Sequence, residues 1–161
     1  MSVVWTLPSS DGWNQVSGRA LRHWTDSSGE ILFMFDISIG GRFWRRDADN
    51  MGELRDDFKC DLPQVLISRN NLRELLDAVK NWLSAPKPIR IGLCERGAQQ
   101  LWISFHVSDD FICSIDRPVC EILYMAERMP EGRWNFVVDQ SCIRLLNDDL
   151  IRVLHAFNGE G

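Results

Sequence analysis

The chain of 161 residues is 45% hydrophobic and 25% charged, which fits a single domain over residues 1–161 that buries one core without disulfides or metal ions. Its formal net charge of −5 argues against nucleic acid as a direct partner, because phosphate binding needs clustered Lys and Arg side chains. The same charge favours a partner with a basic surface.

The N-terminal stretch 1–13 has no basic segment followed by a sustained apolar core, and no apolar run is as long as a membrane span. We therefore expect a cytoplasmic protein without membrane association. The five cysteines are an odd number, form no C-x-x-C pair and have no histidine at ligand spacing. These features predict free thiols rather than a disulfide framework or a zinc site, and no pattern indicates a cofactor.

In chain order, residues Val3–Asp26 predict short irregular strands that cover one side of the core. Residues Glu30–Ile39 predict a core strand, because alternate residues on one face are all apolar: Ile31, Phe33, Phe35, Ile37 and Ile39. Gly40-Gly41 then predicts a two-residue hairpin, with Arg42–Arg46 as the returning strand.

The central helix is the element that the sequence specifies most completely. An apolar stripe with helical spacing runs over about residues 71–84 and consists of Leu72, Leu75, Leu76, Val79, Trp82 and Leu83. Asn71 and Glu74 form the pattern of a capping box, which predicts that the helix begins at Asn71. It ends at Ala85-Pro86, because proline disfavours helical geometry in the residue before it.

The second half of the chain predicts an antiparallel meander and a closing helix. Turn residues separate short apolar runs, which predict strands at Ile89–Cys94, Leu101–Val107, Phe111–Ile115, Val119–Met125 and Trp134–Val138, with Asp109-Asp110 and Arg117-Pro118 among the turns. Asn147 is a candidate N-cap for a helix over about residues 148–157, with Asp148 and Asp149 in its first turn. The fold class is therefore α+β: a curved antiparallel sheet, or a partial barrel or sandwich, packed by the central and C-terminal helices.

Candidates for catalysis each have a structural alternative. His106 shares a strand face with Trp102 and Ser104 and could act as a general base with a nearby carboxylate, although an isolated histidine on a sheet is more often structural. Cys113 and Cys120 flank the predicted Arg117-Pro118 turn and could form a redox pair, although buried free thiols are more common. No catalytic residue is therefore assigned.

The acidic segment Asp47–Asp61 is the strongest candidate for a partner-binding site. It loses the strand alternation, which predicts an exposed connection with a short helical turn anchored by Met51, Leu54 and Phe58. Charge for steering combined with apolar anchors is typical of protein interfaces. The predicted partner-binding residues are Asp47, Asp49, Glu53, Asp56, Asp57, Phe58 and Asp61.

The helix NLRELLDAVKNWLS, the strands after it, the strand RWNFVVD at residues 133–139 and the C-terminal helix together resemble WapI-like immunity proteins of bacterial polymorphic toxin systems. The resemblance covers about residues 64–157. It implies a non-enzymatic protein of bacterial competition that binds a cognate toxin domain and blocks its active site, and the acidic charge suits a basic toxin such as a nuclease.

Two other classes stay open. One is a small α+β enzyme or ligand-binding domain with a pocket near His106, which would use a carboxylate, Cys113 or Cys120 beside the histidine. The other is a self-assembling structural or adaptor protein. A pocket that contains His106 beside a second polar group would favour the enzyme, whereas an immunity protein needs a complementary outer surface.

Overall fold

The computed structural model of the chain describes residues 3–10, 12, 14–41, 44–47, 50–54, 58–96, 99–108, 117–126 and 132–158. Within these residues the chain forms ten strands and two helices. The strands are β1 Val3–Pro8, β2 Asn14–Thr25, β3 Ile31–Gly41, β4 Trp44–Asp47, β5 Asn50–Leu54, β6 Phe58–Ser68, β7 Ile89–Arg96, β8 Gln99–Ser108, β9 Arg117–Met125 and β10 Gly132–Val137. The helices are α1 Arg69–Ser84 and α2 Gln140–Asn158.

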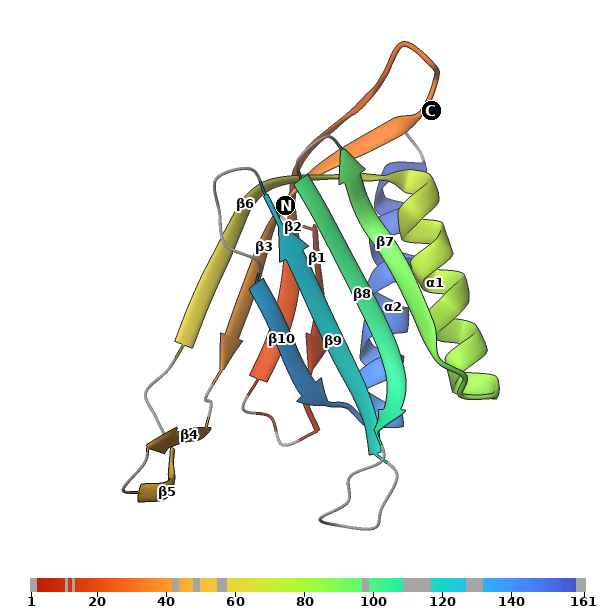
Figure 1. Cartoon of the computed structure of the whole chain (residues 1–161). Coiled ribbons are helices and arrows are strands. Elements are labelled where there is room, and N and C mark those ends of the chain that lie inside the picture. The colour runs from red at the N-terminus through yellow and green to blue at the C-terminus, as the bar shows by residue number, and fades with distance from the viewer. Residues whose placement is uncertain are drawn as a thin grey trace.

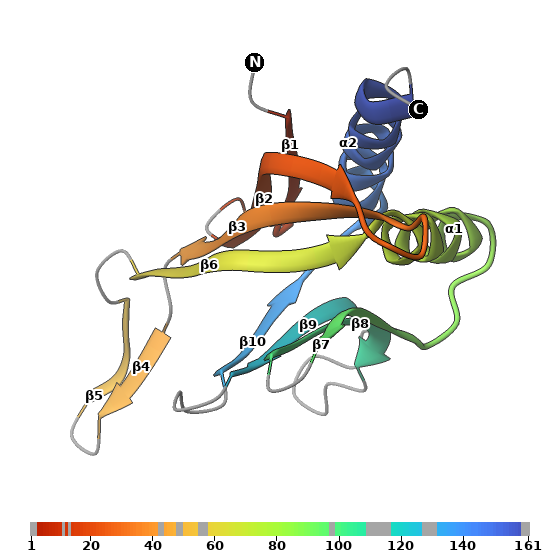
Figure 2. The same cartoon turned by 90° about the horizontal axis from the view of Figure 1, so that it is seen from above.

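The paired strands of the described residues are antiparallel and form a first sheet of order β1-β2-β3-β6, a second sheet of order β10-β9-β8-β7 and a small β4-β5 ladder. In Figure 1 the second sheet lies in front of the first, and both helices run along one side. The β4-β5 ladder projects on the opposite side, as Figure 2 also shows from above. The predicted α+β architecture with a central and a C-terminal helix is confirmed.

The core lies between the sheets and the helices. Buried apolar side chains from both sheets and both helices form one hydrophobic cluster. Within it, the rings of Trp82 on α1 and Phe105 on β8 have centroids 5.9 Å apart, so α1 packs directly on the second sheet.

Strand β3 confirms the predicted apolar face, because Phe33, Phe35, Ile37 and Ile39 are all buried. The predicted Gly40-Gly41 hairpin is wrong. Both glycines continue β3 and pair with β2 on one side and β6 on the other. The two long-range ladders of this central strand thus override the local turn preference of a glycine pair.

The segment after β3 also differs from its prediction. Its described residues include the antiparallel strands β4 and β5, and Phe58 is the first residue of β6. The predicted helical turn is therefore wrong. Three apolar side chains at helical spacing do not select a helix, because nucleating one turn fixes several residues for one hydrogen bond.

The N-terminal strands are longer and more regular than predicted. Strand β2 spans 12 residues and pairs along most of its length with β3. A register shift between Ala20 and Arg22 interrupts the alternation of faces, which is why the sequence pattern reads as irregular there.

The second sheet confirms the predicted meander, with β7, β8, β9 and β10 at the expected positions. The predicted turn at Arg117-Pro118 is wrong, because both residues belong to β9 and pair with β8. Proline is compatible with the first residues of a strand. The predicted strand Phe111–Ile115 and the turn Asp109-Asp110 lie outside the described residues.

Helix α1 has the predicted buried stripe, from Leu72 to Trp82, and ends at Ser84 as predicted. Its N-terminus is corrected. Ser68 is the N-cap, and its hydroxyl accepts a hydrogen bond from the Asn71 N–H at 3.1 Å. The Asn71 side chain instead donates to the Leu93 carbonyl of β7 at 3.1 Å.

Helix α2 begins eight residues before the predicted start at residue 148. The Asp139 carboxylate accepts from the Cys142 N–H at 3.0 Å, which is N-cap geometry. The apolar stripe therefore begins earlier, with Ile143 and Leu146 buried beside Leu150. The predicted N-cap at Asn147 is wrong, because Asn147, Asp148 and Asp149 lie inside the helix.

Candidate functional site

The predicted partner-binding residues are only partly placed by the structure. Asp49, Asp56 and Asp57 lie outside the described residues, and Asp47, Glu53 and Phe58 are positions in β4, β5 and β6. Asp61 is exposed on β6 and lines a depression of about 400 Å³ on the outer face of the first sheet. The depression is lined by Val4, Ser17, Arg19, Asp36, Ser38, Asp61 and Pro63.

Cross-strand register brings these residues together. Directly opposed residues in an antiparallel pair point to the same face of the sheet. One row across the strands contains Val4, Arg19 and Asp36, and the next contains Ser17, Ser38 and Asp61. The core-facing residues between them, such as Gly18 and Ile37, are buried. The outer rows therefore form a mainly polar face, whereas the opposite face of the same strands is apolar and buried.

Asp36, on β3, connects the neighbouring strands β2 and β6 across the depression. One carboxylate oxygen pairs with the Arg19 guanidinium at 3.5 Å, and the other accepts from the Gln64 N–H at 3.3 Å. Gln64 has a φ of 56°, a left-handed conformation that non-glycine residues rarely adopt. It lies at the register shift where β6 has an extra residue opposite β3, and such bulges bend a strand. Figure 1 shows β6 bending before it enters α1.

The chemistry of the depression suits recognition. Asp61 accepts a hydrogen bond from the Ser38 hydroxyl at 3.0 Å. The residues that line the depression include two carboxylates, Asp36 and Asp61, and one cation, Arg19. The ion pair is exposed, with 56% of the Arg19 side chain and 38% of the Asp36 side chain accessible, so it contributes little stability. Carboxylates held at such a surface can accept hydrogen bonds from a cationic side chain of a partner.

A second depression, of about 500 Å³, lies between the two helices and was not predicted. Its lining residues are Arg73, Leu76, Asp77, Lys80, Ile151, Leu154 and His155. Leu76 and Leu154 are buried, and the remaining lining carries charges of both signs. Helix pairing forms this groove, so the sequence of either helix alone carries no indication of it.

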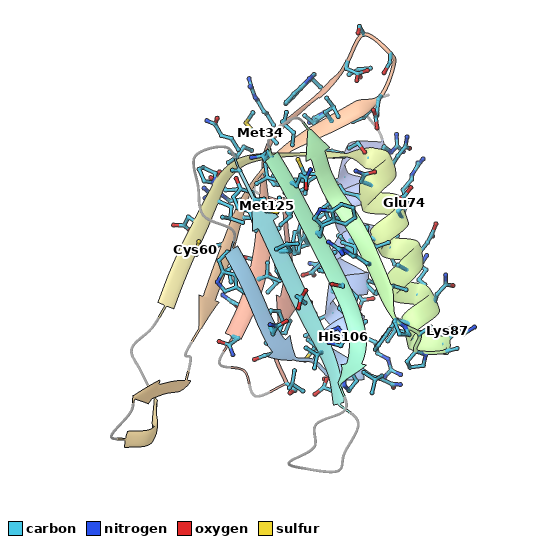
Figure 3. The ribbon with its side chains drawn as sticks, viewed as in Figure 1. Met34, Cys60, Glu74, Lys87, His106 and Met125 are labelled. Atoms are coloured by element: carbon cyan, nitrogen blue, oxygen red, sulfur yellow. The ribbon has the colours of Figure 1, made fainter. Side chains whose placement is uncertain are left out.

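His106 lies in neither of these two depressions. Figure 3 shows it near the end of β8. It is partly buried and pairs in register with Val119, whereas Phe105 pairs with Cys120. His106 and Cys120 consequently point to opposite faces of the second sheet, and the predicted possibility that they act together is wrong. Asp109, Asp110 and Cys113 lie outside the described residues.

The described cysteines Cys60, Cys94, Cys120 and Cys142 are not joined in disulfide bonds. Burial, with a smaller effect from Glu121, strongly raises the pKa of the Cys120 thiol. The described residues include no group of three or more side chains that could bind a metal ion. Neither described helix combines the length and the hydropathy that a membrane span requires.

No protein-family model matches this chain, and no curated protein and no solved structure is significantly similar to it.

Proposed function

We propose that this protein is a non-enzymatic, cytoplasmic immunity protein that binds a cognate bacterial toxin domain and blocks its active site. The toxin we propose is basic, such as a nuclease, whose substrate-binding surface carries positive charge. The overall charge of −5 is complementary to such a surface.

The observation that supports this proposal is the acidic depression on the first sheet. Asp61 belongs both to this depression and to the acidic segment Asp47–Asp61. Ser38 and Asp61 lie near the ends of β3 and β6 that lead into and out of that segment. In the described part of the chain, Asp36 and Asp61 are the carboxylates that this surface offers to a basic partner.

The first experiment is co-expression with the product of the reading frame next to this gene, which the proposal expects to contain a basic toxin domain. We expect the two proteins to co-purify and the toxin to lose its activity in the complex. Toxin activity that is unchanged at saturating concentrations of this protein would contradict the proposed function.

The second experiment measures binding kinetics for a double variant, Asp36→Lys with Asp61→Lys. We expect the association rate to fall by at least about tenfold, and its salt dependence to flatten, because these charges steer the encounter. The matched control is Glu74→Lys with Asp148→Lys, which changes the net charge equally at exposed helix positions. Equal effects of the two double variants would show that the outer face of the first sheet is not the interface.

A third experiment addresses the rest of the acidic segment. Reversing Asp56 and Asp57 to Lys should slow association, whereas Phe58→Ala should raise the dissociation rate by about thirtyfold if Phe58 is a hot spot worth about 2 kcal/mol. Thermal unfolding of each variant separates binding effects from folding effects. Parental kinetics in both variants would place the interface outside this segment.

A further inference from the structure

The two helices cover one outer strand of each sheet. On β1, the Thr6 N–H donates to the Asp149 carboxylate of α2 at 2.9 Å. On β7, the Leu93 carbonyl accepts from the Asn71 side chain of α1 at 3.1 Å. These side chains satisfy main-chain groups that an exposed sheet edge would otherwise present to another protein.

The remaining outer strand of the first sheet, β6, is interrupted instead. Pro63 has no N–H to donate, and Gln64 is in the left-handed conformation at a register shift. Proline and bulges are standard means by which proteins prevent strand addition at an edge. Three of the four outer strands named here therefore carry a protective feature.

The outer strand of the second sheet, β10, presents open main-chain groups. Val138 N–H donates to Pro118 of β9 at 2.9 Å, whereas the Val137 carbonyl accepts from Ser10 N–H at 2.9 Å, on the side away from β9. Because main-chain groups alternate in direction along a strand, those of Arg133 and Asn135 also point away from β9. In the described part of the chain they meet no hydrogen-bond partner, and Asn135 is exposed.

Between these two residues, β10 carries a large aromatic side chain that the core does not cover completely. Trp134 is partly buried and packs against the hydrophobic cluster. Its ring covers Gly132, where an added Cβ would lie 2.1 Å from the Trp134 Cη2. The open edge therefore combines unpaired main-chain groups with apolar surface.

We propose that β10 pairs antiparallel with β10 of a second copy of this chain, in a register centred on Trp134. Arg133 of each copy then lies opposite Asn135 of the other, so that the open N–H and carbonyl groups pair with one another. Trp134 lies opposite its own copy in a non-hydrogen-bonded pair, the arrangement in which cross-strand side chains approach most closely. The interface is isologous and closes with two copies.

The charges along β10 and its existing hydrogen bond to Ser10 are both compatible with pairing to a second copy of the chain. This register places no like charges directly opposite each other, since Arg133 faces Asn135. The hydrogen bonds of this register do not involve the Val137 carbonyl, which already accepts from the Ser10 N–H. A contact of one short strand is at the small end of protein interfaces, so the dimer is reversible and depends on concentration. This inference goes beyond the proposed function and needs no toxin for its test.

Sedimentation velocity over a wide concentration range tests the proposal directly. We expect the mass to rise from the 18.6 kDa monomer towards twice that value as concentration increases. Asn135→Pro should weaken self-association by at least about tenfold, because it removes a bridging N–H on each copy. Asn135→Thr, which keeps that N–H, should associate like the parent. A parent that stays monomeric at every concentration overturns the proposal.

Charge variants test the register without removing a main-chain group. Asn135→Lys should weaken the dimer, because it places Lys opposite Arg133, and Asn135→Asp should strengthen it. Asn81→Lys and Asn81→Asp, at an exposed position of α1, are the matched controls and should leave association unchanged. A dimer that responds equally to the changes at both positions, or that persists in Asn135→Lys and Asn135→Pro, would show that another surface pairs.

Discussion

Trp82→Ala tests whether α1 is the element that holds the second sheet to the core. Trp82 is 2% exposed and its ring packs against Phe105. A buried indole removes about 150–250 Å² from water, which at about 25 cal/mol per Å² corresponds to about 4–6 kcal/mol as an upper estimate. Replacements of buried aromatic residues by alanine cost about 3–5 kcal/mol. We therefore expect a loss of about 4 kcal/mol in the free energy of unfolding.

Urea denaturation followed by circular dichroism measures this loss without depending on tryptophan fluorescence. With a slope of about 2 kcal/mol per molar urea, the midpoint should fall by about 2 M while the slope stays unchanged. Arg73→Ala, on the exposed side of the same helix, should change stability by less than about 0.5 kcal/mol. Small and similar losses in both variants would refute the central role assigned to α1.

Other predictions concern close packing, helix capping and the thiols. A Cβ at Gly18 would lie 2.4 Å from the Trp5 indole, so Gly18→Ala should destabilise by about 1–3 kcal/mol; a neutral effect in thermal unfolding would mean that the ring is seated elsewhere. Asp139→Ala should cost about 1 kcal/mol at neutral pH. Hydrogen bonds lower the pKa of Asp139, so the parent's advantage should be complete above about pH 4 and disappear as the pH falls through that lowered pKa; a difference that persists in acid would contradict the cap. Alkylation with peptide mapping should label Cys60 before the fully buried Cys120, and all five cysteines should titrate as free in denaturant; a mobility shift on reduction would contradict free thiols.

Local periodicity is enough to predict several elements of this fold. The apolar stripe of α1 and the apolar face of β3 repeat within the span of their own element, so the sequence identifies both the element and its buried face.

Element ends depend on distant contacts and were predicted less well. Ser68 and Asn71 are both competent helix caps. The Asn71 side chain donates instead to the Leu93 carbonyl, 22 residues away. Ser68 therefore caps the helix. A Gly-Gly pair such as Gly40-Gly41 favours a turn locally, but in the structure both glycines pair with β2 and with β6. In each case a long-range partner decides between two locally acceptable structures.

The acidic depression illustrates the same division. From the sequence alone, Asp61 is predicted to be an exposed carboxylate within an acidic segment. Its neighbours follow only from the fold, because Arg19, Asp36 and Ser38 come from other strands and lie near Asp61 through strand register. Alternation is a property of each strand and can be read along the chain, whereas register depends on bulges and on pairing between distant segments. The face on which a residue lies is therefore local information, and the residues beside it are not.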